Sequence, residues 1–168
     1  SDAAGSISIN TTGDFVASGG MTFEDAVELD GTTELSSNGI SGNDISFNGA
    51  VTEAGAQSLT LDTGADATVN LNANVTVDAL TVDGATNIGG DRTVDIETAA
   101  TFNGTIGGGN LTLTGDEVEF NGNVSGLNSI VVTGVTSVTI AAGIDFETTE
   151  NTTFASALTV DGATTMTT

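Results

Sequence analysis

The sequence predicts an all-β protein, specifically a parallel β-solenoid, in which the chain coils around a continuous core. Three observations lead to this prediction: short segments alternate apolar and polar residues, Gly, Asn and Asp separate these segments, and near-copies of two short sequences recur. Thr and Val, which favour strands, are abundant, whereas Lys, Arg and Gln, which favour helices, are nearly absent. We therefore expect residues 1–168 to form a single β-solenoid domain.

One recurring segment is built around Phe-Asn-Gly. It occurs as I-S-F-N-G-A-V at 45–51, A-T-F-N-G-T-I at 100–106 and V-E-F-N-G-N-V at 118–124, with looser copies at 21–27 and 69–75. Alternate residues of a strand point to the same side, so the Phe and the Val or Ile around it are predicted to face the core. The Asn side chains predicted to share the opposite face are those of Asn48, Asn72, Asn103 and Asn121.

A second recurring segment, A-L-T-V-D-G-A-T, occurs at 79–86 and again at 157–164, with variants at 58–64, 110–115 and 129–134. Its alternate apolar residues are predicted to form one column inside the solenoid, and its outward positions carry a row of threonines followed by aspartates. The predicted column consists of Leu59, Leu61, Leu80, Val82, Leu111, Leu113, Ile130, Val132, Leu158 and Val160. The outward residues are Thr60, Thr81, Thr112 and Thr159, then Asp62, Asp83 and Asp161.

The alternation of the two segments predicts a coil with one strand of each kind and a less regular third side. A single coil cannot bury its apolar face, and stacking supplies the continuous core. Coils of roughly 20–30 residues give about six to eight turns and a rod about 30–40 Å long, since strands stack about 4.8 Å apart. The alternative is an antiparallel, pilin-like β-sandwich, where short, evenly spaced strands are also expected, although its core has no reason to reuse one strand sequence.

The charge of the chain limits its partners. It carries 23 Asp and Glu residues against one basic residue, Arg92, which gives a net charge of −22. Nucleic acid and anionic membranes are excluded as partners because both are bound through Lys and Arg. Cations and neutral glycans remain compatible with this charge, and salt is expected to control any association between copies.

The missing residue types limit the chemistry. Cys, His and Lys are absent, which rules out Ser–His and Cys–His nucleophiles and transition-metal sites with His or Cys ligands. Carboxylate pairs such as Asp116 with Glu117, or Glu117 with Glu119, leave open a β-helix enzyme that acts on polysaccharides. Solvated surface acids are the simpler interpretation, because sugar-cleaving sites usually use Trp or Tyr platforms and the chain has neither. We predict no enzyme, no catalytic or cofactor-binding residue and no required cofactor.

A calcium site is the remaining hypothesis for the acids. Carboxylate oxygens are ligands that Ca²⁺ prefers. Asp62, Asp83 and Asp161 follow copies of the same strand, so a stacked repeat would place them in related positions. These three residues are the candidate calcium ligands, and diffuse screening by counterions is the alternative.

The repeats T-F-N-G-T-I, N-L-T-L-T-G and A-L-T-V-D-G-A-T resemble those of filamentous haemagglutinin-like adhesins and other bacterial surface proteins with β-strand repeats. The resemblance spans nearly the whole chain. It implies a right-handed parallel β-helix, secretion to the cell surface, and a structural or adhesive role in fibres or biofilm. It supplies no catalytic residues.

The two ends of the sequence carry strand patterns where a solenoid usually has polar caps. S-I-S-I-N at 6–10 alternates as a strand does, and a strand copy occupies 157–164 near the other end. We expect uncapped end coils, so that the chain either continues in a longer repeat protein or stacks head-to-tail into a filament. The alternative function, which belongs to the β-sandwich, is a pilin that polymerises by strand exchange.

Overall fold

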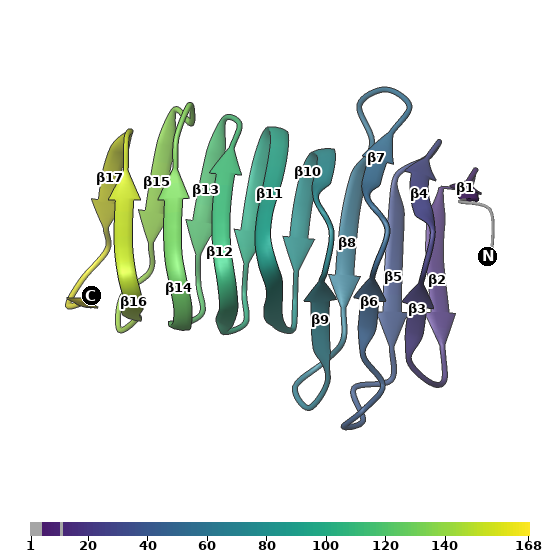
Figure 1. Cartoon of the computed structure of the whole chain (residues 1–168), viewed down its shortest axis with the longest axis horizontal. Helices are drawn as coiled ribbons and strands as arrows, with labels where there is room; N and C mark the ends of the chain where they lie inside the picture. The colour runs from purple at the N-terminus through teal and green to yellow at the C-terminus, as the bar shows by residue number, and fades with distance from the viewer. Residues whose placement is uncertain (1–4, 11) are drawn as a thin grey trace.

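The computed structural model describes residues 5–10 and 12–168, which form strands and turns and contain no helix, and thus none that could cross a membrane. Every hydrogen-bonded strand pair among these residues is parallel. The chain is a β-solenoid of about eight turns, with its N-terminal coil at the right of Figure 1 and its C-terminal coil at the left. The solenoid prediction is confirmed, and the antiparallel sandwich is wrong.

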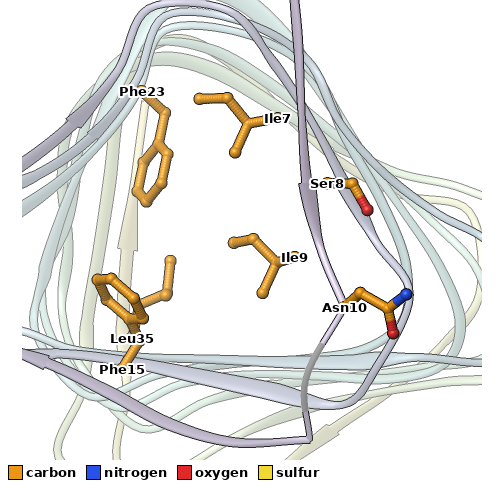
Figure 2. Close-up of a pocket in the computed structure, with 7 residues that line it drawn as sticks. All are labelled: Ile7, Ser8, Ile9, Asn10, Phe15, Phe23 and Leu35. Atoms are coloured by element: carbon orange, nitrogen blue, oxygen red, sulfur yellow. The ribbon is translucent and has the colours of Figure 1, made fainter.

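Each turn has three sides, which we name A, B and C (Figure 2). Side A consists of β3 (Met21–Phe23), β6 (Ile45–Phe47), β9 (Thr68–Leu71), the first parts of β11 (Ala85–Phe102), β12 (Ile106–Thr114), β14 (Val124–Val132) and β16 (Asp145–Phe154), and β18 (Thr165–Thr167). Side B consists of β1 (Ser6–Ile9), β4 (Ala26–Leu29), β7 (Val51–Glu53), the first part of β10 (Val75–Val82), the middle of β11 and the second parts of β12, β14 and β16. Side C consists of β2 (Gly13–Ala17), β5 (Thr33–Ser37), β8 (Ser58–Asp62), the ends of β10 and β11, β13 (Glu117–Phe120), β15 (Ser137–Ile140) and β17 (Ala157–Val160).

The core consists of apolar columns that run along the axis, because equivalent residues of successive coils pair in register. The column of side C contains the buried residues Leu35, Leu61, Val82, Phe102, Phe120 and Ile140. The column of side B contains Val27, Val51, Val75, Val94, Leu113 and Val132. Aromatic rings add stacking within the columns, with centroids 5.0 Å apart for Phe23 and Phe47 and 5.9 Å apart for Phe102 and Phe120.

The recurring segments do not keep to one side of the solenoid. The prediction of a single column through all copies of the second segment is wrong, because 58–62, 79–82 and 157–160 lie on side C whereas Leu111, Leu113, Ile130 and Val132 lie on side B. The Phe-Asn-Gly segment also moves: Phe47 lies on side A, but Phe102 and Phe120 lie on side C. This segment marks a corner, which joins sides A and B in early coils and sides C and A in later ones.

Glycine is required at this corner because successive corners touch through their backbones. A Cβ atom on Gly104 would lie 2.2 Å from the carbonyl oxygen of Gly84, and one on Gly122 would lie 2.1 Å from that of Gly104. In the later coils sides A and B are joined by a bend inside one long strand. There Gly108 has a φ of 109°, which residues with a Cβ rarely adopt.

The position of a phenylalanine along the axis is expected to set its contribution to stability. Phe120→Ala leaves a cavity beside the rings of Phe102 and Phe146 and should lower the free energy of unfolding by about 3–5 kcal/mol. Phe15→Ala, in the first coil, removes a side chain that is already 55% exposed and should cost much less. Denaturant unfolding, monitored by circular dichroism, compares the two variants. Equal decreases in the free energy of unfolding would contradict the placement of Phe120 in the core.

The corner packing predicts a second difference between matched variants. Gly104→Ala forces the stacked corners apart and should cost about 1–3 kcal/mol. Gly19→Ala is the control, because a Cβ atom there would meet nothing within 4 Å. Equal unfolding midpoints for the two variants would show that the corners do not stack as closely as described.

Candidate functional site

The outer surface carries ladders of polar side chains that link neighbouring coils. At the corner between sides A and B, the Asn72 Nδ2 donates to Asn48 Oδ1 at 2.8 Å, and Asn48 Nδ2 donates to Glu24 Oε2 at 2.8 Å. Because the Asn48 amide both donates and accepts, the ladder ties three consecutive coils together on the outside. It supplements the backbone bonds that join the same coils.

A second ladder lies at the corner between sides C and A. Asn121 Nδ2 donates to Asn103 Oδ1 at 2.9 Å, and Asn103 Nδ2 donates to Asp83 Oδ1. The four asparagines predicted to share one face therefore form two separate ladders on different corners. Sequence alone identified the outward asparagines but not the change of corner between them.

The three candidate calcium ligands do not come together. Asp62 and Asp83 follow Leu61 and Val82, which pair on adjacent coils of side C. From Val82 the register runs through Phe102, Phe120 and Ile140 to Val160, so Asp161 lies four coils beyond Asp83, which is roughly 19 Å at 4.8 Å per coil.

The carboxylates of Asp62 and Asp83 already have hydrogen-bond partners within the chain. Asp62 Oδ1 accepts the N–H of Gly64 at 2.9 Å, and Asp83 accepts the amide of Asn103. Across residues 5–10 and 12–168, no group of three or more acidic side chains is placed so that it could hold a metal ion. Calcium binding by Asp62 and Asp83 stays a prediction, and Asp161 belongs to a different part of the rod.

The candidate catalytic acids lie on a flat side of the solenoid. Glu117 and Glu119 occupy alternate, outward-facing positions of β13 and are both exposed. In register with them are only small uncharged residues of the adjoining coils, namely Ala99, Thr101, Ser137 and Thr139. Asp116 lies in the preceding turn, where its carboxylate accepts the hydroxyl of Thr136. This arrangement presents the acids to solvent and does not place two of them across a cleft.

The N-terminal coil opens the apolar core to its surroundings. A cavity of about 270 Å³ lies there, lined by the apolar residues Ile7, Ile9, Phe15, Phe23 and Leu35, with Ser8 and Asn10 beside them. Figure 2 shows the isoleucines, Phe23 and Leu35 around one space inside the coil, whereas Ser8 and Asn10 point outward. We call this opening the N-terminal mouth.

The C-terminal coil also presents core positions on its outer edge. Leu158, Val160 and Met166 are 39%, 40% and 43% exposed. They continue the inner columns, because they pair with the buried residues Val138, Ile140 and Phe146 of the preceding coil. We call this surface, formed by β17, β18 and the second part of β16, the C-terminal face.

Five of the seven exposed large apolar residues of the described chain thus lie at its two ends, namely Ile7, Phe15, Leu158, Val160 and Met166. The sequence patterns at 6–10 and 157–164 indicated strands at these ends, but Phe15 and Met166 carry no repeat signal that would have singled them out. Comparison with protein-family models, with curated proteins and with solved structures found no match to the chain.

The ladder at the corner between sides C and A is expected to contribute to stability. Asn103→Ala removes two hydrogen bonds, to Asp83 and from Asn121, and should lower the free energy of unfolding by about 1–2 kcal/mol. Asn128→Ala is the control, since Asn128 accepts only a long hydrogen bond of 3.4 Å from Thr149. If Asn103→Ala lowers the free energy of unfolding no more than the control does, the ladder does not contribute to stability.

Proposed function

We propose that this chain is a non-catalytic structural or adhesive segment of an extracellular surface fibre, stalk or filament. The observation that carries the proposal is the coil-to-coil continuity: parallel backbone pairing joins the coils on all three sides, and amide ladders reinforce two corners. A rod of this kind gains length by adding coils, each of which contacts only its neighbours. Such an architecture suits a protein that extends away from a surface as a rod.

The negative charge supports a filament that stays separate from neighbouring filaments outside the cell. Acidic side chains on the flanks of the rod repel neighbouring rods and so oppose lateral aggregation. The lack of cysteine suits a rod held together by backbone pairing instead of disulfides. The resemblance to haemagglutinin-like surface proteins supports the same assignment, with neutral glycans as the ligands that the charge allows, and no cofactor is required in this role.

The competing functions draw less support. A pilin that exchanges strands requires a β-sandwich, and the chain is a solenoid. A polysaccharide-acting enzyme requires two acids on either side of a bound sugar, whereas Glu117 and Glu119 project side by side from one strand.

Immunogold electron microscopy of the source cells tests the proposal. Antibodies raised against the purified chain should label projections at the cell surface, and cells that lack the gene should lose both the label and part of their attachment to surfaces. Pre-absorbing the antibody with the chain is the control. Label confined to the cell interior would reject the proposed function.

A further inference from the structure

We infer that an uncharged surface formed by β12 and β14 on sides A and B binds one chain of a neutral, hydroxyl-rich polysaccharide. We call this surface the neutral band and define it as the outward side chains of residues 103–114 and 121–133. Figure 1 shows β12 and β14 side by side, with further coils on both sides of them. The inference deepens the proposed function and rests on it, because it names the surface through which the rod adheres.

The neutral band is free of charge on a strongly acidic chain. Residues 103–114 and 121–133 include no Asp, Glu, Lys or Arg, although the chain has 23 acidic residues. The acids of the same two turns are Asp116, Glu117 and Glu119, which lie at the corner between sides B and C or on side C. A ligand can therefore approach the band without direct contact with a carboxylate of these turns.

Rows of acids border the band along the axis. Asp91 and Asp95 are exposed on β11, the strand before the band, and Asp145 and Glu147 are exposed on β16, the strand after it. Three coil spacings separate β11 from β16, which is roughly 14 Å at 4.8 Å per coil. The space between the two rows has room for an extended polymer chain that lies along the strands.

The area of the band favours a single polymer chain over a protein partner. β12 and β14 have nine residues each, a path of about 30 Å along the strand, so the band covers roughly 400 Å². A stable protein interface buries about 800 Å² on each partner. A second copy of the chain or another globular protein would therefore have to contact the acidic rows as well, whereas a polysaccharide chain fits between them.

The band offers hydrogen-bond donors that the fold does not use. Asn123 Oδ1 accepts the N–H of Asp145 at 3.0 Å, and Asn128 Oδ1 accepts the hydroxyl of Thr149 at 3.4 Å. Within residues 5–10 and 12–168, neither of the two Nδ2 groups donates to another residue, and the hydroxyl of Ser125 is likewise exposed and unbonded. Each amide Nδ2 carries two N–H donors, which suit the hydroxyl oxygens of a sugar.

The carboxylates beside the band define the charge of the ligand. Asp91 Oδ1 accepts the amide of Asn110, and Asp95 Oδ1 accepts the hydroxyl of Thr114, which leaves Oδ2 of both aspartates for a further donor. A sugar hydroxyl can donate to such an oxygen in a charge-assisted hydrogen bond. A polysaccharide with uronate or sulfate groups is repelled by the same carboxylates. The ligand class is therefore an uncharged polysaccharide.

The band is expected to bind weakly on its own. The chain has no Trp or Tyr on which a sugar ring could stack, so hydrogen bonds supply most of the affinity. Many copies displayed together on one surface would bind a long polysaccharide far more tightly than one copy does, because each bound copy raises the effective concentration of the next. Weak sites of this kind suit a fibre that adheres through repetition.

Affinity gel electrophoresis of the purified chain tests the inference, with dextran, galactomannan or β-1,3-glucan in the gel and dextran sulfate as the anionic control. At least one neutral polymer should slow the chain, and dextran sulfate should not. Asn128→Ala and Ser125→Ala should each weaken the retardation constant about fivefold, as expected for one lost hydrogen bond. The matched control is Thr76→Ala, which removes an exposed hydroxyl outside the band and should change nothing.

Three results would overturn the inference: retardation by none of the neutral polymers, retardation by dextran sulfate, or equal effects of the band variants and Thr76→Ala. Circular dichroism checks that each variant folds, and Thr112→Ala, also in the band, replaces one that does not. Surface immunogold label without retardation would reject this inference and keep the proposed function. Retardation that depends on the band, with label confined to the cell interior, would do the opposite.

Discussion

The structure depends on parallel backbone pairing between coils at a fixed spacing. Because each strand must lie in register on its predecessor, every side chain on the inside meets its equivalent from the next coil, and the core becomes a set of columns. This constraint lets a chain with few large side chains fold, since Val, Leu and Ile in columns bury one another along the whole axis. The corner glycines follow from it as well, because coils this close leave no room for a Cβ atom where the backbones touch.

The polar outside obeys the same register. An outward Asn above another Asn can pass on a hydrogen bond, and two corners of the rod use this. An outward Asp above another Asp can only repel it. Asp62 and Asp83 do not bond to each other: Asp62 accepts the backbone N–H of Gly64, and Asp83 accepts the side-chain amide of Asn103. Stacking of the coils therefore stabilises outward amides and threonines. Outward carboxylates are stabilised by hydration and by salt, which screens their repulsion.

Alternation within the strands was enough to predict the fold class and which residues face inward, since a period of two depends only on local geometry. The side of the solenoid could not be predicted from the motifs, because Phe-Asn-Gly encodes a corner and nothing in it says which of the three corners it is. The same limit separated Asp161 from Asp83: identical octapeptides surround them, but four coils of register lie between.

The shift of the Phe-Asn-Gly corner also separates the unit of sequence from the unit of structure. A duplication of this segment need not add a whole turn, since the copied piece can become a different corner while the columns stay filled. Coils of different lengths can then follow one another without a break in the core. A rod of this kind could lengthen during evolution in steps smaller than its own structural repeat.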